Sequence, residues 1–133
     1  LLYHFGSKSA LIAALLDYLA RNYVEALDAA FPQAVAASRK ECVMQVLEIV
    51  RTDPFRPFMR LWWDIIAGAA SGNDAYKESA KVIAEQLLDW FEAHLPQDDP
   101  DPKQGAKLLF TLIEGALMLD EAPSTSTGSS VFS

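Results

Sequence analysis

Apolar side chains recur at spacings of three and four residues along most of the chain, and this period restricts the fold that it can adopt. The first such run extends from Lys8 to about Phe31 and contains Leu11, Ile12, Leu15, Leu16, Leu19, Tyr23 and Leu27. This spacing puts the apolar side chains on one face of an α-helix, whereas a half-buried strand needs strict alternation. We find no convincing strand in the sequence, so the expected fold class is all-α.

Helix-breaking residues divide the pattern into about six helices. We expect longer helices over approximately 8–31, 38–52, 59–70, 75–95 and 103–120, and a single helical turn over 54–59. Proline, glycine and acidic residues fill the joints, most clearly in the loop 96–102. The last helix is apolar around nearly its whole circumference, which requires burial on more than one side.

The two ends of the chain differ from its helical middle. Residues 1–6 have the pattern of the last turn of a helix, with Gly6 suited to the left-handed position after a helix end and Ser7 suited to capping the next helix. Residues 123–133 have the composition of a disordered tail. We therefore expect a helix remnant at 1–6, one antiparallel helical domain at 7–122, and a tail to which we assign no fold.

Charge and hydropathy restrict the class of protein. Apolar residues make up 51% of the 133 residues, which is enough for a substantial core in one domain. The net charge is −7, which is poorly suited to neutralising nucleic-acid phosphates. The sequence has neither a long uninterrupted apolar run nor the pattern of a signal peptide, so we expect a cytoplasmic protein without membrane contact. Cys42 lies in an apolar run and is expected to be a core residue.

The opening residues carry a family signature. The run Leu2-Tyr3-His4-Phe5-Gly6-Ser7-Lys8-Ser9-Ala10-Leu11 resembles the end of the helix-turn-helix in the TetR family of transcriptional regulators, where the recognition helix joins the long helix that follows. The resemblance implies that Tyr3, His4 and Lys8 lie beside the DNA backbone, where contacts position a protein without reading sequence. A packed Tyr3 and solvent-facing His4 and Lys8 are the alternatives. Because the two preceding helices of such a domain are absent from this sequence, we expect operator binding only in a longer protein.

The same resemblance implies a pocket for a small apolar or aromatic effector. Large apolar side chains gather around the proline-broken segment, where helices cannot pack regularly, and they are Phe55, Phe58, Met59, Trp62 and Trp63. Glu114 shares a helix face with apolar residues, so its carboxylate must reach water, a cation or a ligand. The alternatives are a filled aromatic core and an exposed helix edge for Glu114.

The last two helices suit a homodimer in which each subunit contributes two helices to a four-helix bundle. The apolar residues assigned to this interface are Ile83, Leu87, Trp90, Phe91, Phe110, Ile113 and Leu117. Gly115 and Ala116 permit a close approach of helices. The resemblance points to the same arrangement, which would hold two recognition helices about one turn of DNA apart.

The sequence contains no recognisable catalytic constellation. Its two histidines, His4 and His94, have no metal-ligand spacing to a carboxylate, and there is no glycine-rich phosphate loop. We therefore expect no enzyme, metal or cofactor, and His94 is interpreted as a helix-end residue. The expected function is a ligand-responsive transcriptional regulator, and the alternative is a dimeric helical interaction or ligand-binding module without DNA binding.

Overall fold

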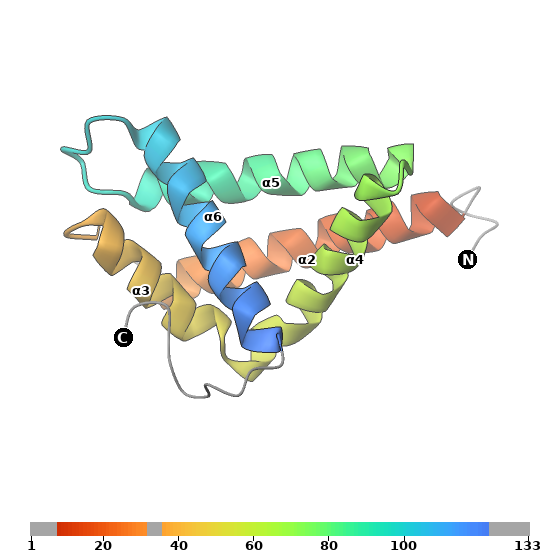
Figure 1. Cartoon of the computed structure of the whole chain (residues 1–133), viewed down its shortest axis with the longest axis horizontal. Coiled ribbons are helices and arrows are strands. Elements are labelled where there is room, and N and C mark those ends of the chain that lie inside the picture. Colours follow the sequence, from red (N-terminus) through yellow and green to blue (C-terminus); the bar gives the residue numbers. More distant parts are fainter. Residues whose placement is uncertain (1–7, 32–35, 123–133) are drawn as a thin grey trace.

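A computed structural model describes residues 8–31 and 36–122 of the chain (Figure 1). These residues form five α-helices and one short 3-10 helix: α2 (Lys8–Ala30), α3 (Arg39–Val50), η1 (Asp53–Phe55), α4 (Arg56–Ala70), α5 (Asp74–His94) and α6 (Pro102–Glu121). The described ranges contain no strand, so the all-α class is confirmed. The predicted helix remnant at 1–6 and the tail at 123–133 lie outside the described residues.

Local capping chemistry explains where the helices begin. The side chains of Ser38, Asn73 and Asp101 each accept a hydrogen bond from the backbone N–H three residues later, at 3.1 to 3.2 Å. Such bonds satisfy backbone donors that have no partner inside the helix. Between α4 and α5 the chain turns at Gly72, whose φ of +94° favours a residue without a side chain.

The helix α4 begins earlier than the sequence pattern predicted. It starts at Arg56, directly after η1, whereas the sequence placed the start near Met59. Pro57 lies in the first turn of α4, where the missing N–H would have no helical partner and costs nothing. The proline-broken segment is therefore mostly the start of a regular helix.

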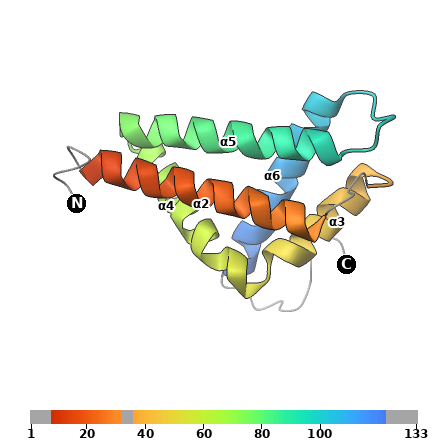
Figure 2. The same ribbon diagram turned by 180° about the vertical axis from the view of Figure 1, so that it is seen from behind.

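The two longest helices, α2 and α5, lie side by side and run in the same direction (Figures 1 and 2). The indole of Trp90 donates a hydrogen bond of 2.6 Å to the Asp28 carboxylate, and its ring packs edge-on against Phe31. The antiparallel arrangement expected from the sequence does not hold for this pair. The reason is that α3, η1 and α4 intervene and return the chain to the end of the molecule where α2 begins (Figure 1).

The core is formed by side chains from all five α-helices. The largest side chains that are almost fully buried are Leu27, Val43, Val46, Leu47, Val50, Ile83 and Leu109. In α6 the burial is one-sided, because Leu109 and Ile113 are buried while Leu108, Leu112 and Leu119 are exposed. The expected burial of α6 on more than one side therefore does not occur among the residues that the structure describes.

Arg39 fixes the start of α6 against α3. Its guanidinium donates two hydrogen bonds to the Asp99 carboxylate, at 2.6 and 2.7 Å, and a third to the backbone carbonyl of Asp101 at 3.1 Å. The hydrogen bond from Arg39 also holds the pKa of Asp99 below its ordinary value.

Among the described residues, none of the helices has the length and hydropathy needed to cross a membrane.

Candidate ligand-binding groove

The helices α4 and α6 converge at one end and diverge toward opposite ends of α5 (Figure 1). A hollow of about 930 Å³ lies between them, with α5 contributing to its wall. We call this hollow the apolar groove, and its lining residues are Trp62, Trp63, Ile66, Ala67, Ala70, Ala84, Leu88, Lys107, Phe110, Thr111, Glu114, Gly115, Met118 and Glu121. The hollow exists because α4 and α5 present small side chains there, namely Ala67, Ala70 and Ala84. Its aromatic lining residues are Trp62, Trp63 and Phe110.

Helical periodicity explains why these residues share one wall. On α6 the lining residues Lys107, Phe110, Glu114 and Met118 are spaced by three and four, so they project from one side of the helix. On α4 the same spacing brings Trp63, Ala67 and Ala70 onto the side of the helix that faces α6. The volume is in the range of sites that hold small organic molecules.

Glu114 is the carboxylate set among these apolar side chains. It is partly buried, and loss of water raises its pKa from 4.5 to about 7, while a hydrogen bond from Trp62 opposes the rise. Burial, with a smaller contribution from Glu114, also raises the pKa of Tyr23, whose hydroxyl stays protonated. Within the part of the chain that the structure describes, no Lys, Arg or His forms an ion pair with Glu114.

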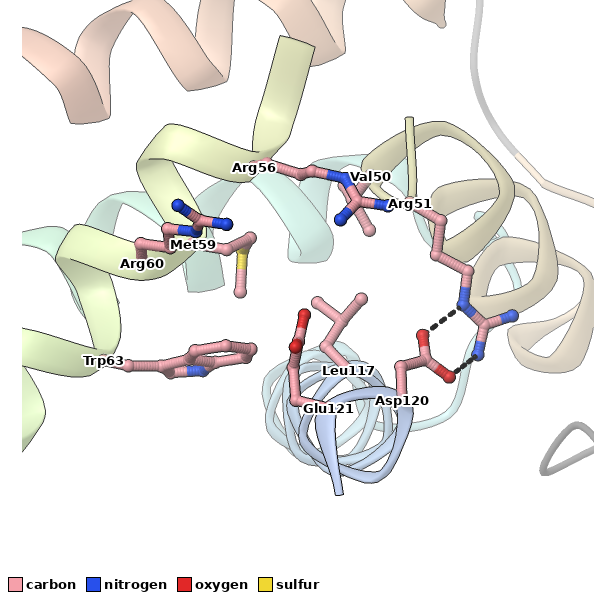
Figure 3. A pocket seen from close by; sticks show the side chains of 9 residues that line it. All are labelled: Val50, Arg51, Arg56, Met59, Arg60, Trp63, Leu117, Asp120 and Glu121. Carbon is pink, nitrogen blue, oxygen red and sulfur yellow. Dashed lines mark hydrogen bonds and ion pairs between the residues drawn. The ribbon is translucent and has the colours of Figure 1, made fainter. Parts of the chain in front are cut away.

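A second hollow lies where α4 and α6 converge (Figure 3). It has a volume of about 480 Å³, and we call it the polar pocket; it is lined by Val50, Arg51, Arg56, Met59, Arg60, Trp63, Leu117, Asp120 and Glu121. Arg51 donates hydrogen bonds of 2.8 and 3.2 Å to the Asp120 carboxylate, which joins the end of α3 to the end of α6. Arg56 pairs with Asp53 on the surface. The acidic partners offset these cations, so the pocket is not a simple anion site.

The structure brings together part of the predicted pocket. Trp62, Trp63 and Glu114 line the apolar groove. Phe55 and Phe58 instead lie in the core, where they pack against the ring of Tyr23 with centroid distances of 5.1 and 4.2 Å. Their placement matches the filled aromatic core that was the alternative.

Met59 is also buried and lines the polar pocket rather than the apolar groove (Figure 3). Met59 was predicted to line the effector pocket, but it does not line the apolar groove. The predicted aromatic cluster is split because successive helical residues point in different directions.

Most of the residues assigned to the dimer interface lie inside this chain. Those that are at most 6% exposed are Ile83, Leu87, Trp90, Phe91, Ile113 and Leu117. Their side chains pack in the core of this chain, so they are not exposed for contact with a second copy. Phe110 is partly exposed and lines the apolar groove. The assignment of these six residues to a dimer interface is therefore wrong. The apolar faces of α5 and α6 pack inside the chain and form part of its own core.

Of the predicted phosphate contacts, Tyr3 and His4 lie outside the described residues. Lys8 is exposed and is the first residue of α2. His94 is the last residue of α5, where it stacks on Trp90 at a centroid distance of 3.8 Å and its Nδ1 lies 2.7 Å from the Trp90 carbonyl oxygen. Its place agrees with the interpretation as a helix-end residue.

Sequence reasoning missed several lining residues of the apolar groove, including Ile66, Ala67, Lys107 and Met118. A signal was present: α6 is apolar all around and yet contains Glu114, which indicates a face that is neither core nor ordinary surface. Small residues in α4 could have indicated the opposite wall.

The described residues contain no group of three or more His, Cys, Asp or Glu side chains that could hold a metal ion. Comparisons with protein-family models, with curated proteins and with solved structures gave no match.

Proposed function

We propose that this chain is the effector-binding and dimerisation domain of a ligand-responsive transcriptional repressor, as its resemblance to the TetR family implies. The observation that carries the proposal is the apolar groove between α4 and α6. Its volume of about 930 Å³, its aromatic walls and its few polar groups are typical of sites for small organic molecules.

A ligand bound in the groove could also change the arrangement of the helices around it. The groove touches three helices, and ion pairs connect the two ends of α3 to the loop before α6 and to the end of α6. A ligand that binds more tightly when α4 and α6 are closer together shifts the domain toward that arrangement. In a regulator, such a shift would alter the separation of two DNA-binding units.

The DNA-binding part of the proposal rests on the resemblance of residues 2–11 to the TetR signature. Lys8, exposed at the start of α2, has the position that a phosphate contact at a helix N-terminus would need. The acidic net charge of −7 opposes DNA binding by this chain alone. Operator binding is therefore proposed only for a protein in which a helix-turn-helix precedes Leu1.

The homodimer is proposed to form through the exposed apolar stripe of α6, which we define as Leu108, Leu112 and Leu119. The three residues are 36 to 59% exposed and share one side of the helix. Gly115 lies beside this stripe, and a side chain placed there would meet no atom within 4 Å. The open space allows a second helix to approach closely. A dimeric helical module without DNA binding is the alternative, and the same stripe supports it.

Calorimetric titration of the chain with naphthylmethanol, a neutral aromatic probe, tests effector binding. We expect saturable binding that is lost in Ala67→Phe, because Ala67 lines the groove and a phenyl ring would fill it. The control is Ala93→Phe, since Ala93 is exposed on α5 and lines neither the apolar groove nor the polar pocket. Equal binding to all three proteins would show that the probe binds elsewhere and would remove the main support for the proposal.

A further inference from the structure

The apolar groove contains a carboxylate, that of Glu114, which forms no ion pair with a cationic side chain of residues 8–31 or 36–122. We infer that the occupant of the groove is an organic cation, in which an ammonium group lies against Glu114 and an aromatic or branched apolar body lies against Trp62, Trp63 and Phe110. The inference rests on the proposed ligand-binding function and goes beyond it by naming the chemical class of the ligand.

The geometry around Glu114 is the first support. The Trp62 side chain approaches the Glu114 carboxylate closely enough to lower its pKa, and the rings of Trp62 and Phe110 stack with a centroid distance of 6.1 Å and an interplanar angle of 27°. Phe110 precedes Glu114 by one helical turn on the same face of α6. An ammonium at the carboxylate would therefore also lie near aromatic faces, which attract cations through their quadrupoles.

The charges along the groove are the second support. Lys107 is the cation that lines it, and it stands two helical turns from Glu114, a rise of about 10 Å along α6. Glu121 adds a second carboxylate to the lining. With Glu114 ionised, the lining carries two negative charges and one positive charge, so a cationic ligand balances the groove.

The other ligand classes fit less well. An anionic ligand would bring a further negative charge into a groove that already has an excess of carboxylates. A neutral apolar ligand would cover Glu114 and remove its remaining water without giving the carboxylate a partner, which is costly. A cationic ligand excludes water from Glu114 and also pairs with its carboxylate, so the charge is not left without a partner.

If the inference holds, the affinity for the cation depends on pH, because Glu114 must lose its proton to pair with the ligand. Three other titratable groups lie around Glu114. They are Tyr23 on α2 and Lys107 and Glu121 on α6, while α4 and α5 present only tryptophan and aliphatic side chains to the groove. Near neutral pH a proton and the ligand compete for the Glu114 carboxylate, whose pKa is about 7. Affinity for the cation should therefore increase as the pH rises through neutrality, and binding near pH 7 should release a proton.

Three probes of the same shape separate charge from apolar contact: naphthylmethylamine, which is a cation, naphthylmethanol, which is neutral, and naphthoate, which is an anion. Titration calorimetry with the chain is expected to show the amine binding on the order of ten-fold more tightly than the alcohol, with naphthoate weakest. Repeating the amine titration in buffers of different ionisation enthalpy should reveal proton release.

Glu114→Gln is the deciding variant, because glutamine keeps the shape and the acceptor for Trp62 but removes the charge. It should bind the alcohol at least as well as the original chain and lose the preference for the amine. Glu85→Gln, a change at an exposed carboxylate of α5 outside the groove, should leave the preference intact. These two results together would support the inference.

Other outcomes overturn it in distinguishable ways. If the alcohol binds as tightly as the amine, or if the preference persists in Glu114→Gln, the cation inference is wrong while the proposed ligand-binding function stands. If none of the three probes saturates the chain, the proposed function fails and the inference fails with it. If probe binding is absent and Ala67→Phe instead changes the association state, the groove is covered by a second copy and both statements are wrong.

Discussion

Glu114 shows how one partly buried side chain can lower the stability of a helical domain. Its neighbours on α6 at spacings of three and four are apolar, and the surrounding helices withhold water from its carboxylate. The folded-state pKa of about 7 lies above the ordinary value of 4.5. The folded state therefore prefers the protonated acid, so the stabilising contribution is present below about pH 4.5 and is lost as the pH rises through 7.

Replacing Glu114 with glutamine should remove this pH dependence. We expect the advantage of Glu114→Gln in unfolding free energy over the original chain to increase by on the order of 2 kcal/mol between about pH 5 and pH 8. Urea titrations of both proteins at the two pH values measure the difference. An advantage that stays constant with pH would mean that Glu114 is well solvated in the folded chain.

Cys42, in contrast to Glu114, is a core residue whose side chain contributes only to packing. It is 3% exposed, and burial raises the pKa of its thiol to about 11. Because the thiolate is the reactive form, we expect a disulfide reagent to label the native chain on the order of a hundred-fold more slowly than the chain in denaturant. A Cys42→Ala, Met44→Cys double variant is the control, since Met44 is 41% exposed on the same helix and its replacement should react readily. Rapid labelling of native Cys42 would contradict the core assignment.

Two glycines within helices test how the elements pack. A methyl group at Gly115 of α6 meets nothing within 4 Å, whereas one at Gly68 of α4 would overlap the ring of Tyr76 at the start of α5. Gly115→Ala should therefore raise the unfolding free energy by about 0.5 to 1 kcal/mol through helix propensity. Gly68→Ala should lower it by roughly 1 to 2 kcal/mol, because the α4–α5 contact must open.

Thermal or urea unfolding of the two variants at low protein concentration measures both effects. Low concentration matters because Gly115 also lies beside the apolar stripe proposed for dimerisation. If Gly68→Ala were as stable as the original chain, Tyr76 would have to move aside freely, and the joint between α4 and α5 would be looser than the structure indicates.

At the scale of the whole molecule, the apolar stripe of α6 is not covered by any of the residues that the structure describes. An exposed row of large apolar side chains on a helix is typical of an interface. We expect the chain to associate in sedimentation equilibrium, and we expect Leu112→Glu to raise the dissociation constant on the order of ten-fold or more. Met44→Glu makes the same chemical change at an exposed apolar residue of α3 and should leave association unchanged. A chain that is monomeric at high micromolar concentration would contradict the proposed homodimer.

Much of the architecture follows from the sequence by itself. The period of the apolar residues, from Leu16 in α2 to Leu109 in α6, determines that the chain is helical. Capping residues such as Ser38 and Asn73 determine where helices begin, because their hydrogen bonds reach only three residues along the chain. These features are local, so the sequence pattern indicates most of them, although α4 begins three residues before the predicted start at Met59.

Only the tertiary structure decided how the helices meet. The sequence could not show that α2 and α5 run in the same direction, or that Phe58 packs on Tyr23 while Trp62, one turn later, reaches the apolar groove. Periodicity assigns a residue to a face, but the distance and the angle between two helices depend on side chains far apart in the sequence. For that reason most of the residues assigned to the dimer proved to be core, and the approach of Trp62 to Glu114 was visible only once α4 was placed beside α6.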